Sequence, residues 1–158
     1  MTIHRLFSKD PNDEEENVTQ NIYVFRFILF CIIVYSFEML LNSVDIFIVD
    51  KTIFTRGYVT GCLFAAVYVL ILLHLGLEHP LTKYVSITAV SLIIMAASVS
   101  LTYHMIIIIM MPIIIAGMYT SKQLSIYTFV LTVLSIIIST YAGYYYCLLY
   151  TSPSPRDM

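Results

Sequence analysis

Hydrophobic and polar residues are distributed very unevenly along this chain. From Ile22 to Tyr146 it is almost continuously apolar, and short polar interruptions divide residues 22–146 into five runs. The runs cover residues 22–41, 58–77, 84–101, 105–119 and 124–146. A helix needs about 20 mostly apolar residues to cross a bilayer core about 30 Å thick, and it satisfies its own backbone hydrogen bonds there. The pattern predicts an all-α fold, a polytopic bundle of about five transmembrane helices.

The fourth run, residues 105–119, differs from the other four. A helix of this length extends about 22 Å at 1.5 Å per residue, which is less than the hydrocarbon thickness. Pro112 lies at its middle and removes one backbone hydrogen bond, so the helix should be kinked there. The run either crosses with help from its flanks or dips into the membrane and returns, and we favour crossing. Pro112 is a candidate hinge.

Composition supports a membrane protein. The chain is 59% hydrophobic and 11% charged, whereas ordinary soluble domains are about 25% charged. The net charge of −2 gives no reason to expect nucleic-acid binding. The lipid bilayer is the predicted partner, and a homodimer formed through membrane helices remains open. No catalytic motif and no cofactor-binding motif is present, so neither catalytic residues nor cofactors are predicted.

Residues 1–21 form a polar head with an acidic run, Asp13 to Glu16. The head lacks the apolar segment of a signal peptide, and we interpret it as a cytoplasmic end. Lys and Arg in short loops favour the inner side of a membrane. With the head inside, the inner side holds Arg5, Lys9, Lys83 and Lys122, and the outer side holds Lys51 and Arg56. The bias predicts a multi-pass protein of the cell membrane with a cytoplasmic N-terminus.

The C-terminal string CLLYTSPSPRD, residues 147–157, resembles translated sequencing adapter. One reading frame of a common transposase adapter translates to these eleven residues without a mismatch. We therefore expect residues 147–158 to be an artefact, which fold reasoning should exclude. We also expect the gene to have been cut at about Tyr146, so that the chain is an N-terminal fragment.

Hydroxyl side chains recur along the fifth run at helical spacing. Their separations of three, four, three and four residues place them on one helix face: Ser125, Thr128, Thr132, Ser135 and Ser139. Small and hydroxyl residues let membrane helices approach closely and form hydrogen bonds. We interpret this face as a packing seam in preference to a polar conduit. Small residues in the third run, such as Ala89 and Ala96, make that helix a plausible neighbour.

Three groups of polar residues are candidates for chemistry. Glu38 lies near the far end of the first run, and intramembrane carboxylates are costly and often functional. It is a candidate sensing residue, although it could instead meet water or Lys51. His104 could ligate haem or respond to pH, but a boundary histidine is the simpler interpretation. His74 and Glu78 have a zinc-compatible spacing, yet a clear further ligand is absent and no metal site is predicted.

Three stretches of sequence carry a family resemblance: His104, residues 112–122 (PIIIAGMYTSK) and residues 141–146 (YAGYYY). With these stretches the chain resembles the multi-spanning N-terminal input region of bacterial membrane-bound signalling proteins, especially clostridial diguanylate cyclases of the GGDEF family. The resemblance implies five or six helices ahead of a cytoplasmic output domain. No GG[DE]EF signature occurs in the chain, so no catalytic residue is carried over. A histidine kinase as parent, or a small integral membrane protein such as a transporter fragment, remains the alternative.

Overall fold

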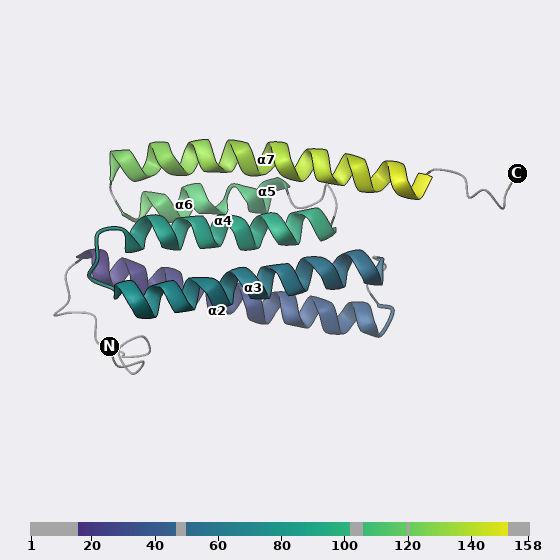
Figure 1. Ribbon diagram of the computed structural model, residues 1–158, viewed down its shortest axis with the longest axis horizontal. Coiled ribbons are helices and arrows are strands. Elements are labelled where there is room, and N and C mark those ends of the chain that lie inside the picture. Colours follow the sequence, from purple (N-terminus) through teal and green to yellow (C-terminus); the bar gives the residue numbers. More distant parts are fainter. Residues whose placement is uncertain (1–15, 47–49, 102–105, 120, 152–158) are drawn as a thin grey trace, which may run out of the picture.

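The computed structural model describes residues 16–46, 50–101, 106–119 and 121–151 and is all-helical across them. Four helices are long: α2 (Glu16–Ser43), α3 (Lys51–Leu75), α4 (Thr82–Leu101) and α7 (Lys122–Thr151). Two short helices, α5 (Ile106–Ile109) and α6 (Met111–Gly117), lie between α4 and α7 in the chain. Successive segments run in alternating directions along one long axis (Figure 1). The all-α bundle predicted from the sequence is confirmed.

The four long helices have the length and apolarity that a membrane crossing needs. Many large apolar side chains on their outer faces are exposed, including Phe30, Ile33, Leu63, Leu70 and Ile137. A helix that is apolar on its exposed face as well as its packed face belongs in lipid. The protein is a multi-pass membrane protein.

α4 is the central helix. It packs against α2, α3, α5, α6 and α7, and 56% of its span is buried inside the bundle, compared with 17–22% for the other three spans. Buried Ile87, Val90 and Ile93 provide its part of the core. Because small residues such as Ala89 and Ala96 alternate with these larger ones, neighbours on several sides can approach α4 closely.

The α5–α6 segment is interrupted where the sequence contains Pro112. α5 ends at Ile109, Met110 forms a turn, and α6 restarts at Met111 with the proline in its first turn. Proline is tolerated there because the first residues of a helix have no intrahelical acceptor for their N–H groups. The short, proline-kinked fourth helix predicted from the sequence is therefore present as two helices. Figure 1 shows them running back alongside α4, so the segment connects opposite ends of the bundle.

Polar residues set the helix ends. The Asp50 carboxylate caps α3 by accepting from the backbone N–H groups of Thr52 and Ile53 at 2.9 and 3.0 Å, as N-cap residues do. α3 ends at Gly76, whose φ of 83° is a conformation that favours glycine. The Thr82 hydroxyl then donates to the Gly76 carbonyl at 2.7 Å and closes the turn into α4.

Two features differ from the sequence prediction. The predicted polar head covers residues 1–21, whereas α2 begins at Glu16 and buries Val18, Gln20 and Asn21. Lys51, a suggested partner of Glu38, instead forms an ion pair with Asp45 at 2.8 Å. Asp45 follows the end of α2 and Lys51 is the first residue of α3, so this ion pair joins the ends of the two helices.

Candidate functional site

A buried polar cluster lies at the end of the bundle where α2 begins. Asn21 is 2% exposed, and its amide donates to the Leu77 carbonyl at 2.9 Å. The Tyr119 hydroxyl donates to the Asn21 amide oxygen at 2.8 Å. One asparagine thus joins α2 to the α3–α4 turn and to the residues that follow α6.

A second pair extends the cluster toward α3 and α4. The Tyr68 and Ser86 hydroxyls are 3.1 Å apart, and both residues are buried. Beside them, the Gln20 amide donates to the Met118 carbonyl at 2.6 Å. Buried polar groups in an apolar surrounding must be hydrogen-bonded to avoid a desolvation cost. The cluster therefore fixes how α2, α3, α4 and α6 meet at this end.

Sequence reasoning does not find this cluster. The sequence pattern places Asn21 in the polar head, and it does not distinguish Tyr68 and Tyr119 from the other eleven tyrosines. The partners Asn21 and Tyr119 are 98 positions apart, so no local spacing reports the contact. The one available signal is the position of two adjacent amides, Gln20 and Asn21, directly before an apolar run.

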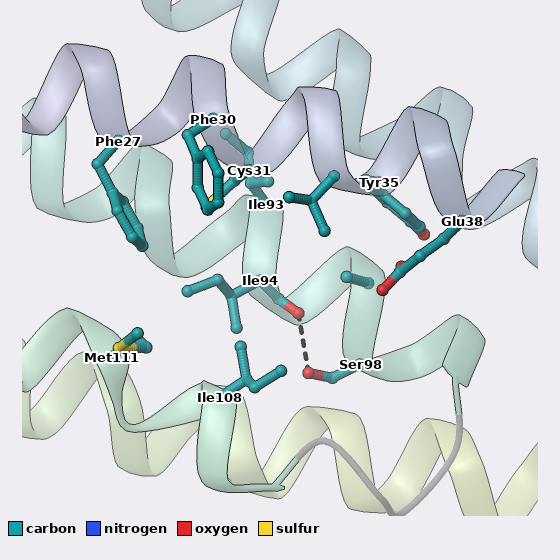
Figure 2. A pocket seen from close by; sticks show the side chains of 12 residues that line it. Phe27, Phe30, Cys31, Tyr35, Glu38, Ile93, Ile94, Ser98, Ile108 and Met111 are labelled. Carbon is teal, nitrogen blue, oxygen red and sulfur yellow. Dashed lines mark hydrogen bonds between the residues drawn. The ribbon is translucent and has the colours of Figure 1, made fainter.

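A groove lies farther along the bundle, toward the C-terminal end of α2, and Glu38 is one of its lining residues. It has a volume of about 190 Å³, and α2, α4 and the α5–α6 segment provide its lining. Figure 2 shows Phe27 and Met111 at one end and Ser98 and Glu38 at the other. The Ser98 hydroxyl is already bonded to the Ile94 carbonyl at 2.8 Å. The groove is therefore almost wholly apolar except for the carboxylate at one end.

Glu38 is half-buried and its carboxylate has no hydrogen-bond or ion-pair partner among the described residues. Five residues separate it from the end of α2 at Ser43, about 7.5 Å along the helix axis. Glu38 therefore lies near one end of the first apolar span. In Figure 2 its oxygen atoms are directed from α2 toward the groove.

The hydroxyl residues of α7 are distributed over buried and exposed positions. Thr128, Thr132 and Ser135 are buried, Ser139 is half-buried, and Ser125 is exposed. α7 packs against α4 and α6. The hydroxyls of Thr128 and Ser135 are bonded within α7 to the carbonyls four residues earlier, at 2.7 and 2.9 Å.

Two contacts between α4 and α7 come from three residues outside this set. The Thr88 and Tyr127 hydroxyls are 2.7 Å apart, and the Tyr84 and Tyr127 rings meet edge to face with centroids 5.4 Å apart. Edge-to-face aromatic pairs are favourable beyond their area burial. The two parallel helices are therefore held in register near their N-terminal ends.

The remaining candidates are separated in space or lie outside the description. Pro112 is buried in α6. His104 lies outside the described residues. His74 and Glu78 are exposed, and the described residues contain no group of three or more side chains suited to hold a metal ion. The groove that Glu38 lines contains none of the α7 hydroxyl residues.

The fold and its two polar features define a helical, multi-pass membrane protein with a buried hydrogen-bonded cluster and a lateral groove. Comparison with known proteins adds no family: no family model matches the chain, and neither the curated proteins nor the solved structures give a match.

Proposed function

We propose that this chain is the membrane-embedded sensory or anchoring module of a bacterial signal-transduction protein. Its intact parent would carry a diguanylate cyclase output domain of the GGDEF type downstream of Tyr146. In this proposal the bundle receives a stimulus and transmits it to the catalytic domain that follows it in the parent protein.

The observation that carries the proposal is the course of the α5–α6 segment. On the α5 side of the break, Ile108 contributes to the groove, and Met111 does so at the start of α6. Beyond α6, Met118 and Tyr119 are hydrogen-bonded to Gln20 and Asn21. One interrupted segment thus connects the groove to the end of the bundle where α2 begins. A helix broken at proline is a candidate hinge for such coupling.

The charge distribution supports a cytoplasmic N-terminus. Lys83 and Lys122, at the beginnings of α4 and α7, share the bundle end at which α2 begins, while Lys51 and Arg56 are at the opposite end (Figure 1). An excess of Lys and Arg in short loops marks the inner side of a membrane. We therefore propose that the end of the bundle where α2 begins faces the cytoplasm.

Membrane-impermeant maleimide labelling of intact cells tests this orientation. After replacement of the three cysteines of the chain, a Thr52→Cys variant should be labelled from outside. A Gln123→Cys variant should be labelled only after permeabilisation, since Gln123 is exposed at the other end. The reverse labelling pattern would invert the proposed orientation.

The sequence of the gene beyond the Tyr146 codon tests the function itself. A soluble domain with a GG[DE]EF signature is the expected result. A stop codon after one or two further apolar segments, with no soluble domain, would refute the signalling proposal.

A transporter fragment is the second candidate, favoured by the discontinuous α5–α6 segment. Transporters use broken helices near the membrane midplane, usually in two related halves. A second broken helix in the downstream gene, at a corresponding place in an inverted repeat, would support this candidate in place of the first.

A further inference from the structure

A second groove lies between α3 and α4, toward the end of the bundle where α3 begins. Residues 53–64 of α3 and 95–99 of α4 contribute its lining, and its volume is about 210 Å³. The two helices are antiparallel neighbours (Figure 1). This α3–α4 groove is open to the outside of the bundle, and polar atoms form part of its wall. It therefore offers both a polar and an apolar surface to a molecule of the surrounding membrane.

The charge in the α3–α4 groove comes from Arg56, the one charged residue of its lining. The Thr60 hydroxyl, which belongs to the same lining, already donates to the Arg56 carbonyl at 2.8 Å. The Arg56 guanidinium has no hydrogen-bond or ion-pair partner within the described chain. The nearby cation Lys51 is paired with Asp45. Since arginine is always charged and carries five N–H donors, the group that complements this groove is an anion.

The position of Arg56 along α3 indicates how an occupant would be oriented. Arg56 is five residues from the start of α3, about 7.5 Å along the helix axis, and α3 is a candidate membrane span. A long basic side chain near the end of a span reaches the lipid headgroups. Phe64 lies eight positions further, about 12 Å deeper. An occupant would therefore hold its anionic group at Arg56 and its hydrocarbon part toward Phe64.

The volume limits how much hydrocarbon the α3–α4 groove can take. A dry cavity of about 150 Å³ holds one benzene molecule, so on the same scale about 210 Å³ holds about eight carbon atoms. This is the upper part of one acyl chain. Because the groove is open to the outside of the bundle, the remainder of a lipid can stay in the surrounding bilayer.

We propose that the α3–α4 groove binds an acidic phospholipid, with the phosphate at Arg56 and the upper part of one acyl chain against Phe64. The guanidinium donates two parallel hydrogen bonds to phosphate oxygens, a geometry that arginine is suited to form. A zwitterionic lipid carries its own ammonium beside the phosphate, whereas an acidic lipid keeps a net negative charge that attracts a basic residue. The site therefore selects its lipid by headgroup charge.

Quenching of tryptophan fluorescence by brominated lipids tests this site, because the chain contains no tryptophan. Phe64→Trp places a reporter in the groove. Leu63→Trp places a matched reporter at nearly the same depth but outside the lining, on the exposed face of α3. The full chain is reconstituted in vesicles of dioleoylphosphatidylcholine. The probes are phosphatidylglycerol and phosphatidylcholine brominated at carbons 6 and 7 of one chain, which differ only in their headgroups.

We expect half-maximal quenching of the Phe64→Trp reporter at a mole fraction of brominated phosphatidylglycerol about fivefold lower than that of brominated phosphatidylcholine. The Leu63→Trp reporter should distinguish the two probes by less than about twofold. Adding Arg56→Gln should reduce the preference at Phe64→Trp to less than about twofold, while Lys122→Gln, at the other end of the bundle, should leave it unchanged. Adding Val99→Phe, which fills the groove from α4, should weaken quenching by both probes. Far-UV circular dichroism checks that each variant remains helical.

Four results would overturn the proposal. Equal quenching of the Phe64→Trp reporter by the two probes would mean that the groove does not recognise headgroup charge. The same preference at Leu63→Trp would mean that acidic lipid gathers around the whole protein without a site. A preference that survives Arg56→Gln would assign the selectivity to another residue. Unchanged quenching after Val99→Phe would place the acyl chain outside the groove.

Discussion

The hydrogen bonds of Asn21 should contribute measurably to the stability of the bundle. Asn21→Leu, a replacement of similar size, removes both the bond to the Leu77 carbonyl and the bond from Tyr119. Hydrogen bonds between membrane helices average about 0.6 kcal/mol and reach about 1.7 kcal/mol. The substitution should therefore lower the free energy of unfolding by about 1.2 kcal/mol, with about 3.4 kcal/mol as the upper bound.

A double-mutant cycle isolates the contact with Tyr119. Tyr119→Phe removes only one of the two bonds and should lower the free energy of unfolding by about 0.6 kcal/mol. Combining it with Asn21→Leu should add nothing more for that bond, so the two effects should fall short of additivity by about 0.6 kcal/mol. Tyr141→Phe is the matched control, since Tyr141 is 72% exposed.

Reversible unfolding by sodium dodecyl sulfate in mixed micelles, followed by far-UV circular dichroism, measures these free energies. Strict additivity of Asn21→Leu and Tyr119→Phe would refute the reasoning. So would a Tyr119→Phe effect no larger than that of Tyr141→Phe. Either result would mean that the cluster exchanges its partners freely.

Three further substitutions can be measured in the same unfolding assay. Gly61→Leu should destabilise the bundle by about 1–3 kcal/mol, because a Cβ added at Gly61 lies 3.3 Å from the Tyr35 ring. Gly143→Leu is the control and should be tolerated, because a Cβ added there meets nothing within 4 Å. Equal effects of the two substitutions would contradict this reasoning. Pro112→Ala should change the free energy of unfolding by less than about 1 kcal/mol, since the proline occupies the first turn of α6. An increase of about 3 kcal/mol would instead indicate that the proline interrupts the middle of a helix. Thr132→Val should leave the free energy of unfolding unchanged or raise it, because the buried Thr132 hydroxyl has no hydrogen-bond partner among the described residues. A decrease in the free energy of unfolding of more than about 1 kcal/mol would show that the hydroxyl has a partner.

The sequence alone predicts how many apolar segments the chain has and that they are helical. Run length and apolarity determine which segments can cross a bilayer, and both are local properties of the chain. The effect of Pro112 is also local, since proline limits helix geometry within one turn. The placement of the break at Met110 requires the packing of α5 and α6 against α4.

The buried cluster and the groove could not be predicted, because each depends on distant segments. Asn21 resembles any polar residue at a membrane boundary until Tyr119 and Leu77 are seen beside it. Glu38 stands out in the sequence by its charge, but its relation to Ser98 and Ile108 depends on where α2 lies against α4. Side-chain periodicity gives the face of a helix and does not identify its neighbour.

Among the described residues, the α5–α6 segment is hydrogen-bonded to α2 at one end, through Asn21 and Gln20. At its other end, the groove separates Ile108 from α2. At that end α5 packs against α4 and α7 instead. A shift of α2 away from α5 would therefore leave in place the two hydrogen bonds that join α2 to the residues after α6.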